Sequence, residues 1–304
     1  MAIPSTGMVL LVVGGILMFL NTFFVALRLY TRIVVVRSVR ISDALLVLAL
    51  GAFGALYGLL VIGVKGGIGG SILQAGLAGI AVSLKVIFFL EIIYVVLTSA
   101  MKASIALTFI RLSRSKFLNI LFWASIGLDV LISAAFIIYL LVQCKPIDYA
   151  WRMLEANAKG ECLPLTGQLY MGYALSIVTA TLDALLMISP WFMMRGRGLH
   201  PRLKLCIYGL FGLGILATIA NIIRLVALVK LKGSSDQLAP VFNWSAIEVS
   251  IGIIIAGLIE LGPLAAKFGI GGFENYASDD DRYPLTKNTH ESNFQEYEMD
   301  SRKV

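Results

Sequence analysis

One stretch decides the fold class: LKVIFFLEIIYVVLTSAMKASIALTFIR, residues 84–111. It exceeds the roughly 20 apolar residues that a helix needs to cross a bilayer, yet it contains Lys85, Glu91 and Lys102. A charged side chain at bilayer depth is costly, so it is kept where it faces a bundle interior, water or a partner. Glu91 and Lys102 are 11 residues apart, which returns to nearly the same helix face. The stretch is therefore expected to sit inside a bundle, with one lipid side and one polar side.

The composition indicates an all-α polytopic membrane protein. The 304 residues are 59% hydrophobic and 14% charged, and the mean hydropathy is +0.88, whereas a soluble domain is roughly half apolar and a quarter charged. The net charge of +7 lies in short loops between apolar runs, a pattern typical of membrane orientation and not of nucleic-acid binding. No charge precedes Arg28, so the first apolar run is expected to be a span and not a cleaved signal peptide.

Seven segments are long enough to span a membrane and predict a seven-helix transmembrane bundle within residues 1–264. They are residues 7–27, 43–64, 80–109, 117–142, 167–193, 205–229 and 241–264. Residues 72–79 precede the third span and are expected to form a glycine-loosened lead-in at the outer surface.

Orientation follows from the basic residues. The loops after the first, third and fifth spans hold eleven Lys and Arg residues, against six in the opposite loops. The positive-inside rule then places the N-terminus outside and the C-terminus in the cytoplasm of a multi-pass protein, in the plasma membrane or an endomembrane.

Residues 265–304 change character. They include three consecutive acidic residues at 279–281, and they contain few aliphatic side chains. Such a segment is expected to form a disordered cytoplasmic tail. It either solubilises the protein or carries regulatory phosphorylation.

Two of the three cysteines fall in one loop. Cys144 and Cys162 lie in the loop assigned to the outside, whereas Cys206 begins the sixth span. An oxidising compartment favours a disulfide that closes this loop over the bundle mouth. The alternative is a pair of free, buried thiols.

A further set of residues recurs in a recognisable order. The set comprises Arg28-Leu-Tyr-Thr-Arg32, Asp43, Tyr94, Lys102-Ala-Ser104-Ile105, Arg111, Cys144-Lys-Pro146, Trp151, Cys162, Asp183, Pro190, Arg224, Trp244 and Glu248. By their order and spacing the chain resembles the fungal rhodopsin-like domain of integral membrane proteins, the family named after a satratoxin-cluster membrane protein and related to the Pth-type receptors of plant-pathogenic fungi. The resemblance implies a receptor-like seven-helix protein or an accessory protein of secondary metabolism.

The chain departs from that family in ways that bear on function. Asp43 follows a serine where paired aspartates are usual, and Thr179 stands where asparagine is usual, which weighs against conventional receptor signalling. Microbial rhodopsins resemble one another in a Schiff-base lysine on the seventh helix. Residues 241–264 contain no lysine, and Lys267 follows Pro263. Retinal is therefore not expected, nor is any other cofactor.

The charged residues within the spans define a candidate buried polar site. Its members are Lys85, Glu91, Lys102, Asp183, Arg224, Trp244 and Glu248. Buried ions need partners, so Arg224 is expected to pair with Glu248 or Glu91, and Lys102 with Asp183. Two interpretations remain open, namely structural clamps that fix helix order and a small-molecule pocket.

Catalytic and metal signatures are not evident. His200 and His290 fall in a loop and the tail, away from carboxylate or cysteine clusters, so no metal site is predicted. Serine, histidine and aspartate form no hydrolase pattern at membrane depth.

Three functions are compatible with these features. The first is a receptor-like sensor of an extracellular small molecule, whose partners are membrane lipid and a lipophilic ligand. Its short inner loops argue against G-protein coupling. The second is a membrane enzyme, a cyclase or isomerase of secondary-metabolite biosynthesis, in which paired acids protonate a substrate. The third, a transporter, lacks an evident inverted repeat.

The predicted orientation can be tested by labelling. An epitope before the first span should be reached by antibody on intact cells, whereas one after residue 268 should need permeabilisation. Labelling of both epitopes from the same side would contradict an odd number of crossings.

Overall fold

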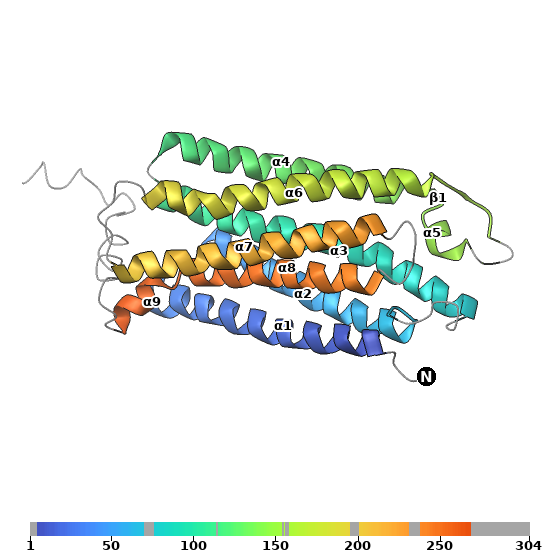
Figure 1. Ribbon diagram of the computed structural model, residues 1–304, viewed down its shortest axis with the longest axis horizontal. Helices are drawn as coiled ribbons and strands as arrows, with labels where there is room; N and C mark the ends of the chain where they lie inside the picture. The colour runs from blue at the N-terminus through green and yellow to red at the C-terminus, as the bar shows by residue number, and fades with distance from the viewer. Residues whose placement is uncertain are drawn as a thin grey trace, which may run out of the picture.

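The computed structural model describes residues 5–69, 76–113, 115–153, 155, 158–194, 201–230 and 238–268. Seven long helices dominate this part of the chain: α1 Ser5–Tyr30, α2 Ile41–Lys65, α3 Gly76–Leu112, α4 Lys116–Val142, α6 Leu165–Met194, α7 Pro201–Lys230 and α8 Leu238–Ile259. The short elements are the π-helix η1 Thr31–Val35, the strands β1 Cys144–Lys145 and β2 Glu161–Cys162, and the α-helices α5 Tyr149–Arg152 and α9 Gly262–Lys267. Seven helices are long and apolar enough to cross a membrane, which confirms the predicted all-α bundle (Figure 1). The predicted tail lies mostly outside the described residues.

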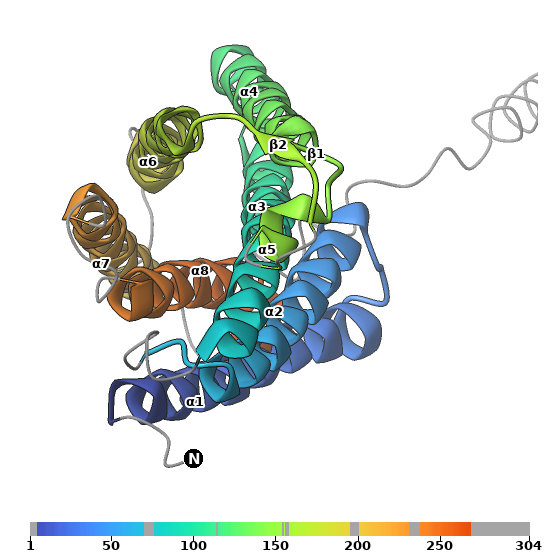
Figure 2. The same cartoon turned by 90° about the vertical axis from the view of Figure 1, so that its right-hand side faces the viewer.

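The long helices run side by side, and the bundle has two distinct ends (Figure 1). We call the end with β1, α5 and β2 the disulfide end, and the end with η1 and α9 the arginine end. Viewed from the disulfide end, α3 and α8 lie among the other long helices (Figure 2). The closest packing joins α2 to α3, α7 to α8 and α1 to α8. Helices α3 and α8 therefore occupy the centre of the fold.

The bundle is apolar outside and partly polar inside. Phe19, Phe117 and Leu131 are 71%, 72% and 69% exposed, whereas Arg28, Asn21 and several other polar residues are buried. Exposed apolar side chains on this scale are expected of a surface that faces lipid. The protein is thus a multi-pass integral membrane protein.

Helix α3 is longer than the bilayer requires. Its 37 residues span about 55 Å at 1.5 Å per residue, against roughly 30 Å of hydrocarbon. Residues 76–79, expected in a loosened lead-in, are therefore helical; residues 72–75 lie outside the described part of the chain. Lys85 is exposed near the start of this helix, so its assignment to a buried site was wrong.

Helix α6 continues through Pro190. Proline has no N–H, so the carbonyl of Leu186, four residues earlier, loses its helical partner. The Ser189 hydroxyl donates to that carbonyl at 2.7 Å. This side chain supplies the missing hydrogen bond inside the membrane, where water is not available to do so.

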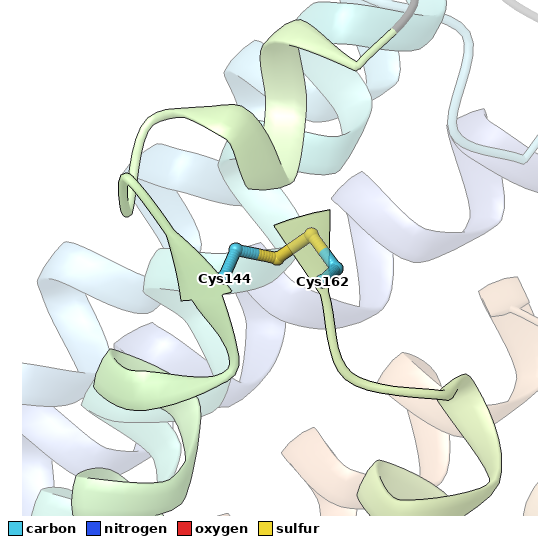
Figure 3. The surroundings of a disulfide bond; sticks show 2 residues. All are labelled: Cys144 and Cys162. Carbon is cyan, nitrogen blue, oxygen red and sulfur yellow. A yellow bond between two sulfur atoms is a disulfide. The ribbon is translucent and has the colours of Figure 1, made fainter. Parts of the chain in front are cut away.

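The predicted disulfide is present between Cys144 and Cys162, which face each other on the antiparallel strands β1 and β2 (Figure 3). The loop between them packs on α3, because the Trp151 ring lies 5.6 Å from that of Phe88 and 6.2 Å from that of Phe89. Aromatic pairs at such distances are favourable. The loop that was expected to cover the bundle mouth therefore lies against α3 at the disulfide end (Figure 2).

The turn after α2 gives a stability prediction. Gly69 has φ +87°, and a Cβ added there would lie 2.9 Å from both N and Cα of Gly7 in α1. Gly69→Ala should destabilise the protein by more than about 1 kcal/mol, since both the backbone conformation and the close approach oppose it. Thermal unfolding of the purified protein measures this. The matched control is Gly51→Ala, because a Cβ at Gly51 meets no atom within 4 Å. Equal melting temperatures for the two variants would contradict the prediction.

Candidate functional site

A buried polar network lies in the middle of the bundle. We call it the central network, and it consists of Tyr94 and Lys102 from α3, Asp183 from α6, Asn221 and Arg224 from α7, and Glu248 from α8. Four long helices thus meet through polar side chains. Each side chain reaches the bundle interior because its helix turns an apolar face outward.

Two ion pairs form the framework of the central network. Lys102 Nζ lies 3.2 Å from Asp183 Oδ1, and Arg224 Nε lies 3.1 Å from Glu248 Oε2. The sequence predicted the pair of Lys102 with Asp183 and left Arg224 to pair with either Glu248 or Glu91; the structure has Glu248. Lys102 also donates to the carbonyl oxygen of Thr179 at 3.2 Å. Coulomb attraction inside a low-dielectric interior offsets desolvation only where such additional hydrogen bonds exist.

Neutral side chains connect the two ion pairs. The Asn221 amide nitrogen donates to Glu248 Oε1 at 2.9 Å and lies 3.5 Å from Asp183 Oδ2. The Tyr94 hydroxyl donates to Glu248 Oε2 at 3.3 Å, and the Arg224 guanidinium lies 5.3 Å from the Tyr94 ring centre. The Lys102–Asp183 pair and the Arg224–Glu248 pair therefore form one network. Asn221 was not predicted, since an amide in a long apolar run gives little signal.

The other predicted members lie elsewhere. Glu91 accepts two hydrogen bonds from the Gln168 amide of α6, at 2.9 and 3.2 Å. Lys85 lies with its ammonium 5.7 Å from the Trp151 ring at the disulfide end. Trp244 is half-buried one helical turn before Glu248. Four of the seven predicted residues are thus brought together.

A second buried network lies at the arginine end. We call it the arginine network, and it comprises Arg28, Arg32, Ser42, Asp43, Thr108 and Glu260. The Arg28 guanidinium contacts Asp43 Oδ1 at 2.8 Å and the carbonyl oxygen of Ala256 at 2.6 Å. Arg32 pairs with Glu260, whose Oε1 accepts from the Thr108 hydroxyl at 3.1 Å. This network joins α1, η1, α2, α3 and the end of α8.

The burial of Arg28 was not predicted, because Arg28 and Arg32 had been assigned to a loop. Both side chains are almost fully buried, with side-chain exposures of 0% and 7%. Their i, i+4 spacing places them on one helix face. Asp43 at the start of α2 and Glu260 directly after α8 were the signal that could have identified their partners.

Two cavities lie beside the central network. The main cavity, of about 70 Å³, lies between α3, α6, α7 and α8, and its wall includes Asp183 and Glu248. The small cavity, of about 10 Å³, lies between α3, α4 and α6, and is lined by Lys102 and Asp129. Asp129 Oδ1 is buried and has no hydrogen-bond partner among the described residues. Within those residues no three His, Cys, Asp or Glu side chains group as a metal site.

These features define a class: a seven-helix integral membrane protein with two internal ion networks. The fungal rhodopsin domain family matches residues 27–267, and the chain belongs to that family. Searches of curated proteins and of solved structures gave no match.

The family name invites a test for retinal, and the residues present do not fit a covalently bound chromophore. Helix α8 has no lysine, and Lys267 is exposed on α9. Lys102 is at bundle depth, but its ammonium is occupied by Asp183 and the Thr179 carbonyl. Neither lysine is therefore suited to a covalent bond with retinal.

The arginine network gives a second stability prediction. Glu260→Met should lower the free energy of unfolding by about 3–5 kcal/mol, since Arg32 would stay buried without its nearest counter-ion and would keep the more distant Asp43, 4.0 Å away. Replacing both partners, Arg32→Met with Glu260→Met, should recover much of the loss. Denaturation of the four proteins of this cycle measures the coupling. The control is Arg152→Ala, whose ion pairs with Asp148 and Glu155 are exposed; it should not alter stability measurably. Additive losses in the cycle would contradict the pairing.

Proposed function

We propose that this protein is a receptor-like sensor of a small molecule, with the disulfide end outside the cell or in the lumen of an organelle. The observation that carries the proposal is the position of the central network: it joins α3, α6, α7 and α8, and two of its carboxylates face the main cavity. A molecule bound in that cavity would contact groups that hold four helices together.

The central network is suited to a change between two states. Asn221 contacts both Asp183 and Glu248, so a shift of either carboxylate alters the hydrogen bonds of the other. A ligand shifts such an equilibrium by as much as its affinity differs between the two states. Helix α6 is the natural moving part, because it packs only lightly on α3.

The partners follow from the two surfaces of the bundle. Lipid covers its exposed apolar faces, and a small lipophilic ligand occupies the cavity. At the arginine end the connections at residues 36–40 and 113–115 are short, so little surface is offered to a G protein. We therefore favour transmission of the signal by a different partner or by the tail.

The alternative is a membrane enzyme of secondary metabolism, a cyclase or isomerase. Carboxylates that face an apolar cavity would suit such a reaction, which needs a proton donor. Asp183 and Glu248 are each engaged by a basic side chain, at 3.2 and 3.1 Å, so neither carboxyl group of the cavity wall lacks a basic partner. The ion pairs therefore weigh against this alternative.

A strain that lacks the chain tests the proposal. Deletion should change the expression of many genes without accumulation of a metabolic precursor. Reintroduced wild-type protein should restore expression, as should Arg152→Ala. The double variant Arg224→Met with Glu248→Met should reach the membrane at normal levels, because the ion pair is removed as a unit, and should not restore expression.

Two outcomes would contradict the sensor. Full restoration by the double variant would make the central network a structural clamp only. An accumulated precursor with unchanged gene expression would indicate an enzyme.

A further inference from the structure

The wall of the main cavity includes two acidic side chains of the central network but neither of their basic partners. Asp183 and Glu248 belong to its wall, whereas their partners Lys102 and Arg224 do not. Asp183 also keeps 18% of its side chain exposed, against 5% for Lys102. A molecule that enters this cavity therefore meets carboxylate oxygens first.

The charges around the two cavities do not balance. Lys102 and Arg224 are two basic side chains, whereas Asp129, Asp183 and Glu248 are three acidic ones. Asp129 lies within electrostatic range of both Lys102 and Asp183. An uncompensated carboxylate in a membrane interior is costly, so one additional positive charge would stabilise this part of the bundle.

The remainder of the cavity wall is apolar, and the cavity is small. The wall includes Phe109, Met187, Phe211 and Ala217, and Phe211 is 38% exposed, so this part of the wall reaches the surface of the bundle. A volume of about 70 Å³ is roughly half of a cavity that accepts benzene. The cavity suits a short hydrocarbon group, and the end of a longer group would leave the cavity beside Phe211.

We propose that the main cavity binds a small organic monocation, an alkylammonium whose positively charged head lies against Asp183 and Glu248 and whose hydrocarbon part fills the apolar end. This inference rests on the proposed function, since it assigns a ligand class to the same cavity. An anion would meet the two carboxylates directly. A bare metal ion would lack the full set of oxygen ligands that it needs.

The test uses purified full-length protein and three matched probes: n-butylammonium, n-butanol and butyrate. Butylammonium should raise the melting temperature saturably by about 3 °C or more, whereas the neutral and anionic probes should not. Equal shifts with butanol would overturn the assignment of a cation while leaving a ligand cavity, and with it the proposed function, intact. No shift with any probe would overturn the inference.

Two variants separate the cavity from the charge. Ala217→Leu fills the cavity without removing a charge and should abolish the butylammonium shift. The control is the same change at Ala124, which is exposed on α4 and outside the cavity wall, and should preserve the shift. Asp129→Asn removes the excess negative charge without touching the main cavity and should weaken butylammonium binding severalfold. Unchanged binding in Ala217→Leu or in Asp129→Asn would contradict the proposal.

The pH supplies the remaining comparison, because a proton could also neutralise the excess charge. Butylammonium should raise the melting temperature at neutral pH, where the amine of the probe carries its positive charge. Stabilisation by falling pH alone, with no effect of butylammonium at any pH, would make the proton the occupant and overturn the inference.

Discussion

The structure depends on one constraint: an ion inside a lipid-embedded bundle must find its counter-ion on another helix. Arg28 and Arg32 find theirs on α2 and at the end of α8, and Lys102 and Arg224 find theirs on α6 and α8. Apolar contacts hold membrane helices together in many orientations, because lipid tails are as apolar as leucine. An ion pair is specific to one neighbour and one rotation. The two networks therefore specify which helices adjoin and which faces meet.

Helices α3 and α8 belong to both networks. In α3, Lys102 serves the central network and Thr108 the arginine network; in α8, Glu248 serves the central network, and the Ala256 carbonyl oxygen accepts a hydrogen bond from Arg28 of the arginine network. A displacement along either helix would disturb both sets of hydrogen bonds. The central position of α3 and α8 thus has an electrostatic cause as well as a geometric one. It also offers a physical route by which the middle of the bundle and its arginine end influence each other.

Much of the fold was predictable. The spans follow from the length of the apolar runs, and the disulfide follows from the oxidising compartment to which the loop with both cysteines was assigned. The pairs Lys102–Asp183 and Arg224–Glu248 were predictable for the same reason that they exist, since each is a charge that requires a partner. The extent of α3 was harder, because glycines at its start lower helix propensity without preventing a helix. Residues that serve as connectors were missed, since Asn221 carries no charge and Arg28 resembles an ordinary basic residue at a span end. The cavity could not be predicted, because it arises from side chains of four helices that meet only in three dimensions.

The Ser189–Leu186 hydrogen bond has a mechanical consequence for α6. With Pro190 in place, the backbone bond that would resist flexing at this point does not exist, and the serine hydroxyl already satisfies the spare carbonyl. The end of α6 after Pro190 is held by one main-chain hydrogen bond fewer than in an ordinary helix, so bending at this point costs less free energy. Since Pro190 also borders the main cavity, this joint lies beside the space where a bound molecule would press on the helix.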